Sequence, residues 1–241
     1  MLLKTNLREL NALNPAIFAN DLIICQSDYL DKTAIYLHPE YNKIQGNVPL
    51  DRVVGHSQMY DEMTWGDCLA GRYLKRIDSG LRRLEANPSY YLDSSPKEGV
   101  AFTKIGNDYF IITGKHRTVI ARFLQYYNQN VFASASPLSN VSIYERTVDY
   151  QYMALIKAVD MLKELYPNLE FVMEYTHSNE ERCLSVHPRR YGMPSGFFTR
   201  SELTDCISDF KKPSLMKKLN SSKTHQFVSY SDCLKSFFRT L

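Results

Sequence analysis

An α/β fold is predicted by the way strand-like and helix-like patterns alternate along the middle of the chain. Residues 100–105 and 109–112 are short apolar runs separated by Gly106-Asn107-Asp108, which is typical of a hairpin turn. Helical apolar spacing follows from about Lys115 to Tyr127, and a further strand is expected over 141–144. The 241 residues are 44% apolar, which is enough for a sizeable core.

Before this central part, the pattern is helical at two places. Apolar spacing over residues 7–19, interrupted by Asn14-Pro15, predicts two short helical pieces, and residues 20–50 are expected to be irregular or to form short strands. Thr64 and Asp67 have the spacing of a capping box, which indicates the start of a helix that reaches to about residue 86.

After the central part, Asp149 can cap a strong helix that Pro167 ends, and a strand is predicted over 169–175. Residues 176–200 are expected to form a loop, and helices are expected over 201–210 and 231–241. The C-terminal part is therefore predicted to be an α-rich extension. We expect three parts: residues 1–47, 48–166 and 167–241.

Several classes of protein are disfavoured by the composition. No run of 18 apolar residues occurs, so no membrane partner is expected. Five cysteines without a C-x-x-C pair argue against a disulfide framework and against a zinc ribbon. The start of the chain lacks the features of a secretory signal, and the cytoplasm is the expected compartment.

Positive charge is concentrated near the C-terminal end of the chain. Residues 211–241 carry seven basic side chains and one acidic one, which gives +6, while residues 1–210 carry −3. Such asymmetry indicates either a contact with nucleic acid or simply a solvated tail. The candidate contacts to a DNA backbone are Arg72, Arg76 and Arg83 in the predicted 67–86 helix and Lys211, Lys212, Lys217 and Lys218 in the tail.

The segment from Tyr109 to Arg122 carries the main functional signal. A predicted strand ends at Gly114, and a helix begins directly after it. The first amide groups of a helix have no acceptor within it and lie at the positive end of the helix dipole, so they attract phosphate. The side chains expected to add donors there are Lys115, His116, Arg117 and Thr118. A plain turn glycine with solvated basic neighbours is the alternative.

With Gly114-Lys115-His116-Arg117 opening a helix after a strand, the chain resembles the ParB/sulfiredoxin-like superfamily over roughly residues 48–165. The resemblance implies a mixed sheet with flanking helices, and nucleotide phosphates held at the helix start by His116 and Arg117. Some members bind or hydrolyse CTP or ATP, and some nick or degrade DNA. An acidic-rich motif of partition proteins is matched only loosely, by Glu145, Arg146 and Asp149.

Two departures from the superfamily narrow the expected function. Sulfiredoxins place their catalytic cysteine directly before His-Arg, whereas this chain has Lys115 there, and an amine cannot replace a thiolate. Partition proteins continue into a helix-turn-helix domain, and residues 166–241 show only a faint candidate for one. Repair of oxidised peroxiredoxin and reading of a centromere sequence are therefore not expected.

The first functional hypothesis is a nucleotide-dependent enzyme that acts on DNA, either a nuclease or an NTP hydrolase. Its candidate catalytic residues are His116, Arg117 and Glu145, with ATP or CTP as the nucleotide. Any Mg²⁺ would be held by Glu145 and Asp149. The alternative is a non-catalytic module that regulates or binds a partner, or a second copy of itself, in a plasmid, phage or defence system. A third hypothesis is an adaptor that reuses the fold without binding a nucleotide.

Overall fold

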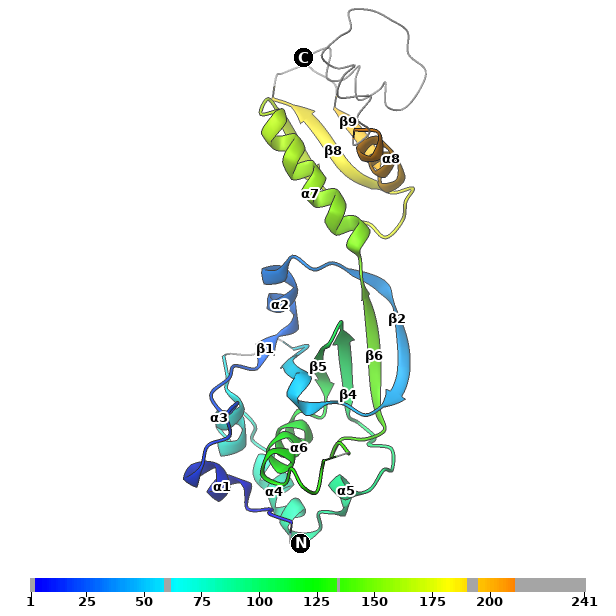
Figure 1. Ribbon diagram of the computed structural model, residues 1–241. Coiled ribbons are helices and arrows are strands. Elements are labelled where there is room, and N and C mark those ends of the chain that lie inside the picture. The colour runs from blue at the N-terminus through cyan, green and yellow to red at the C-terminus, as the bar shows by residue number, and fades with distance from the viewer. Residues whose placement is uncertain (1–2, 59–61, 134, 190–194, 211–241) are drawn as a thin grey trace, which may run out of the picture. The chain divides into compact units, whose positions relative to one another are not determined.

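The computed structural model describes residues 3–58, 62–133, 135–189 and 195–210, and it confirms the α/β prediction (Figure 1). The chain divides into two compact units, residues 1–148 and 149–241. These limits differ from the expected boundaries at 47/48 and 166/167. Residues 37–46 form a strand of the first unit's sheet, and the helix over 150–165 belongs to the second unit. No helix in the described ranges is long and apolar enough to cross a bilayer.

A six-stranded mixed sheet forms the centre of the first unit, in the order β1-β3-β5-β4-β6-β2. Its strands are β1 (Ile24–Cys25), β2 (Leu37–Gly46), β3 (Val53–His56), β4 (Ala101–Ile105), β5 (Asp108–Thr113) and β6 (Val141–Val148). Strands β4 and β5 are antiparallel neighbours, which confirms the predicted hairpin. Strands β1, β3 and β5 run parallel to one another, so their carboxyl ends lie at the same edge of the sheet.

Helices lie on both faces of this sheet. They are α1 (Leu7–Leu13), α2 (Gln26–Thr33), a 3₁₀ turn η1 (Leu50–Arg52), α3 (Trp65–Ala70), α4 (Ile77–Ala86), α5 (Ser89–Leu92) and α6 (Lys115–Tyr127). Helix α6 packs against α1, α3 and α4, and it buries Val119, Ile120, Phe123 and Leu124 completely. Each such side chain contributes roughly 1.5–3 kcal/mol. On the opposite face, Phe110 packs against Tyr29 of α2.

The expected helix over 67–86 is in fact two helices. Thr64 does cap the first, because its hydroxyl accepts a hydrogen bond from the Asp67 N–H at 3.1 Å. Helix α3 then ends at Gly71, whose φ of +96° is left-handed, as is common at helix C-termini. Strand β2 was also missed, because it contains Pro39. As an outer strand with a register shift between Leu37 and Tyr41, it tolerates a residue without an N–H group.

The second unit contains α7 (Tyr150–Leu165), β7 (Leu169–Met173), β8 (Arg182–Pro188), β9 (Gly196–Thr199) and α8 (Arg200–Phe210). Its strands form an antiparallel sheet in the order β7-β8-β9. The expected loop over 176–200 was wrong, because β8 and β9 lie within that range. Residues 183–186 are buried consecutively, and this removes the polar alternation that signals a strand. The predicted cap and helix after Asp149 are confirmed. The expected helix over 231–241 lies outside the described residues.

Candidate anion-binding site

Gly114 joins β5 to α6 in the turn that the sequence predicts. Its φ of +86° lies in the left-handed region, which glycine adopts without strain. A Cβ atom at this position would lie 2.9 Å from Cγ2 of Val100, so a side chain also lacks space. We call Gly114–Arg117 the α6 start. The sharp turn points the first amide groups of the helix toward the edge where β5 ends.

The first hydrogen bond of the helix runs from the Thr118 N–H to the Gly114 carbonyl, at 2.9 Å. The N–H groups of Lys115, His116 and Arg117 therefore have no acceptor within the helix. The Thr118 side chain is buried, and its hydroxyl donates to the same Gly114 carbonyl at 3.1 Å. Thr118 thus stabilises the first turn. It had been expected to donate to a ligand, but its hydroxyl donates to the backbone instead.

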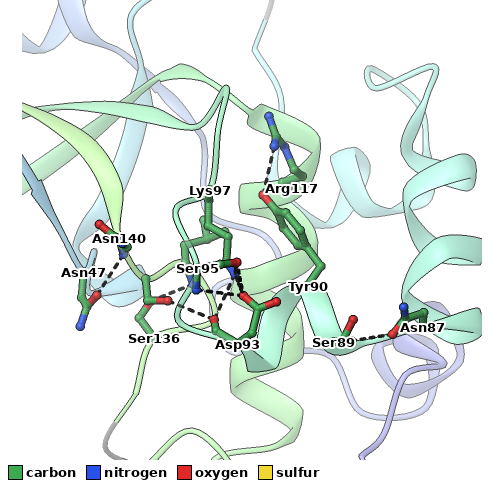
Figure 2. A network of polar contacts seen from close by, with 12 residues as sticks. Asn47, Asn87, Ser89, Tyr90, Asp93, Ser95, Lys97, Arg117, Ser136 and Asn140 are labelled. Atoms are coloured by element: carbon green, nitrogen blue, oxygen red, sulfur yellow. Dashed lines mark hydrogen bonds and ion pairs between the residues drawn. The ribbon is translucent and has the colours of Figure 1, made fainter.

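Arg117 is held by the segment that precedes β4 (Figure 2). Its guanidinium donates to the Tyr90 hydroxyl at 3.0 Å, to the Glu98 carbonyl at 2.7 Å and to the Gly99 carbonyl at 2.5 Å. Three of its five N–H groups are therefore used within the protein. Arg117 contributes positive charge to the α6 start, but its main contacts fix residues 89–100 against α6.

A buried lysine strengthens the same segment. The Lys97 side chain is fully buried, donates to the Asp93 carbonyl at 3.0 Å, and forms an ion pair with the Asp93 carboxylate (Figure 2). Its Nζ atom lies 4.9 Å from the centre of the Tyr90 ring. Hydrogen bonds from Lys97 and then Ser95 hold the pKa of Asp93 well below its usual range. The 89–100 segment is thus fastened both to itself and to Arg117.

The Lys115 and His116 side chains are the other two polar side chains of the α6 start. Burial lowers the pKa of both. The positive charges of Arg76, Lys115 and Arg117 lower the pKa of His116 further, so its imidazole is neutral at pH 7. The buried Nε2 atom of His116 has no hydrogen-bond partner among the described residues. Every charged group that shifts the His116 pKa is cationic, and such a field favours an anion.

Three residues near Lys115 were not anticipated from the sequence. His56 ends β3, and burial followed by the Lys115 charge lowers its pKa to about 4. Burial raises the pKa of the Cys68 thiol to about 11, and Cys68 and Cys25 both interact electrostatically with Lys115. Cys25 and His56 come together because the parallel strands β1 and β3 end at one edge of the sheet, whereas Cys68 lies in α3. Isolated His and Cys residues in the sequence give no signal of this convergence.

Glu145 lies away from the α6 start. It neighbours Lys104 across the sheet and forms a 2.8 Å ion pair with it, whereas Thr113, which precedes Gly114, neighbours Ala101. Lys104 and Ala101 are three residues apart, or roughly 10 Å along the strand. The hydrogen bond from Lys104 lowers the pKa of Glu145. The structure therefore does not bring Glu145 together with His116 and Arg117.

Asp149 belongs to the second unit and is completely buried. Its carboxylate caps α7 and forms an ion pair with Arg200, so it is committed to the structure of that unit. The Mg²⁺ site expected at Glu145 and Asp149 stays a prediction. Within the described ranges, no group of three or more His, Cys, Asp or Glu side chains could hold a metal ion.

The three candidate DNA-binding arginines are not on one helix. Arg72 lies between α3 and α4 and forms a 2.8 Å ion pair with Asp67. Arg76 directly precedes α4, Arg83 lies near the end of the same helix, and both are exposed. The candidates Lys211, Lys212, Lys217 and Lys218 lie outside the described residues. Among the three arginines, Arg76 is the one whose charge lowers the pKa of His116 at the α6 start.

No family model, curated protein or solved structure matches this chain. The resemblance to the ParB/sulfiredoxin-like superfamily therefore stays a prediction that depends on the Gly114–Arg117 motif and its position between a strand and a helix.

Proposed function

We propose that the α6 start binds the phosphate groups of a nucleotide. The observation that carries this proposal is the charge around His116, where Arg76, Lys115 and Arg117 all contribute positive potential. The first turn of α6 contains no acidic residue, and no side chain caps its amide groups. The α6 start also lies at the carboxyl ends of parallel strands, where α/β proteins commonly bind ligands.

Each group at the α6 start would have a separate role. The amides of Lys115 and His116 would donate to phosphate oxygens, and the Lys115 ammonium would supply a positive charge beside them. The His116 imidazole would donate one further hydrogen bond. Arg117 would act mainly through its charge, because three of its donors are already used. A hydrogen bond to a charged group contributes about 1.5–3 kcal/mol, so two would give substantial affinity.

The position of Glu145 favours a binding or regulatory module over a nuclease or an NTP hydrolase. Hydrolysis needs a group that orients water or a metal ion beside the phosphate. The carboxylate expected to do this is paired with Lys104 elsewhere on the sheet. Nucleotide binding would then serve to change the affinity for a partner. That partner is proposed to be DNA, contacted non-specifically through exposed Arg76 and Arg83.

Calorimetric titration with ATP, CTP and pyrophosphate, each with and without Mg²⁺, tests the proposal. We expect saturable binding by at least one of them, weakened tenfold or more in Lys115→Met, because a charged contact is lost while the side chain's length is kept. Lys163→Met is the matched control, since Lys163 is an exposed lysine of α7 paired with Asp160. Absence of binding by all three anions, or equal affinity in Lys115→Met, would refute the site.

Turnover is tested separately by following phosphate release and the nicking of supercoiled plasmid. For a binding module we expect neither activity above background, with or without Mg²⁺. If either occurs and is abolished in Glu145→Gln, the enzymatic alternative is correct and the module is not. If activity is lost in Lys104→Met but kept in Glu145→Gln, the loss comes from a disturbed sheet and the Glu145 carboxylate has no catalytic role.

A further inference from the structure

A separate cavity of about 540 Å³ lies beside the second half of α6. It is bounded by the 17–21 segment, by η1 and by residues 122–133. Gln125, in its wall, is ten residues from Lys115, which is roughly 15 Å along the helix. The volume is typical of pockets that bind small organic molecules. This cavity is thus distinct from the α6 start.

Part of the cavity lining is apolar and buried. Phe18, Leu50 and Phe132 are all buried and line it. Arg122 forms part of the wall, with its guanidinium carbon 4.3 Å from the centre of the Phe18 ring and 4.1 Å from that of Trp65. One Arg122 nitrogen also donates to the Val53 carbonyl at 2.7 Å. The guanidinium is therefore fixed by stacking and by the backbone.

Two carboxylates line the same cavity from different elements. Asp21 follows the 17–20 turns and Asp51 lies in η1, and both are exposed. Asp21 forms no side-chain hydrogen bond or ion pair with any described residue, while the pair of Asp51 with Arg52 is long, at 3.9 Å, and exposed. Both raise the Arg122 pKa against burial, which lowers it to about 10. The charged lining, two carboxylates and one guanidinium, therefore sums to −1.

We propose that this cavity binds a small organic cation with an apolar body, such as an aryl-alkyl ammonium ion. The ammonium would lie between Asp21 and Asp51, which have no strong partner within the described residues. The apolar body would cover Phe18, Leu50 and Phe132. The two parts of the ligand are thereby matched to two parts of the cavity, since charge meets charge at the mouth and apolar surface meets apolar surface at the floor.

The test is an NMR titration of the ¹⁵N-labelled chain with phenethylammonium. Two probes of similar shape are the controls: neutral 2-phenylethanol and anionic 3-phenylpropionate. We expect phenethylammonium to shift amide signals of residues 17–21 and 125–129 saturably, with a Kd at least tenfold lower than that of either control. Equal affinity for the alcohol, or shifts centred elsewhere, would overturn the proposal.

Variants separate this cavity from the nucleotide site. The double change Asp21→Asn with Asp51→Asn should raise the Kd for phenethylammonium at least tenfold and remove the preference over 2-phenylethanol, because it deletes the charge and keeps the shape. Lys115→Met should leave the Kd for phenethylammonium and the preference over 2-phenylethanol unchanged, whatever it does to nucleotide affinity. The same titration is repeated with the peptide acetyl-Phe-Arg-amide. Stronger binding of this peptide than of phenethylammonium would show that the site takes a protein side chain and that the assignment to a free amine is wrong.

Discussion

Removal of the Asp149 carboxylate should destabilise the second unit strongly. Asp149 and Arg200 are 0% and 2% exposed, and they form an ion pair. The carboxylate also caps α7 by accepting from the Tyr152 N–H at 3.0 Å, and it accepts from the Tyr175 hydroxyl at 3.2 Å. Asp149→Ala therefore removes a helix cap and leaves the Arg200 guanidinium buried without its counter-charge.

The expected loss follows from these contacts. Breaking a buried ion pair by removing one partner costs about 3–5 kcal/mol, and loss of the helix cap adds about 1 kcal/mol. The double variant Asp149→Ser with Arg200→Met should recover at least about 2 kcal/mol, because serine can still cap the helix and neither charge remains. Asp160→Ala, which breaks an exposed pair with Lys163, should cost less than about 1 kcal/mol.

The assay is urea unfolding at pH 7, followed by far-UV circular dichroism. Fluorescence of Trp65, the single tryptophan, follows the first unit and separates its transition from that of the second. A loss below about 1 kcal/mol in Asp149→Ala would refute the reasoning, since it would mean that the buried pair is not needed. If the double variant is as unstable as Asp149→Ala, the unpaired Arg200 charge is not the cause of the loss.

Three further effects are expected in the first unit. In thermal unfolding, Gly114→Ala should lower the unfolding free energy by about 1–3 kcal/mol more than Gly106→Ala. Both glycines have positive φ, but only a Cβ at position 114 meets neighbouring atoms. Equal losses would contradict this. Arg117→Ala should cost about 1.5–3 kcal/mol in urea unfolding, because three hydrogen bonds to the 89–100 segment are lost, whereas exposed Arg83→Ala should cost less than about 0.5 kcal/mol. In the folded protein the pKa of His56 is lowered from 6.5 to about 4, so between these pH values only the unfolded chain binds the proton. The unfolding free energy should therefore fall as the pH falls through that window, by up to about 3 kcal/mol. Unfolding of His56→Gln at pH 7 and 4.5 should show a smaller loss than the wild type, and an equal loss would contradict the assignment.

The contacts of Arg117 within the protein change how the anion site must be probed. Loss of binding in Arg117→Ala would mix loss of charge with movement of the 89–100 segment, because that side chain connects α6 to Tyr90 and to two carbonyl groups. Lys115 and His116 are better probes. Lys115→Met removes the charge and keeps the length of the side chain, so a change in affinity there reports on the charged contact to the ligand.

Elements whose signals are local were predictable from the sequence. The β4–β5 hairpin depends on the Gly106-Asn107-Asp108 turn, α6 and α7 depend on apolar spacing, and the Thr64 and Asp149 caps depend on contacts three residues apart. Gly114 was also identified correctly as the turn before α6. In each case the stabilising contacts lie within a few residues of the signal.

Other features depend on partners far away in the chain, and only the tertiary structure decided them. Arg117 contacts residues 18 to 27 positions earlier, and nothing within its own helix shows that its guanidinium will be used there. The register of β4 with β6 places Glu145 beside Lys104, about 10 Å from where a ligand role would need it. The sequence therefore determined where the Gly114 turn joins β5 to the start of α6, because that depends on local backbone geometry. The fold decided which charged side chains remain available there, because that depends on contacts between distant segments.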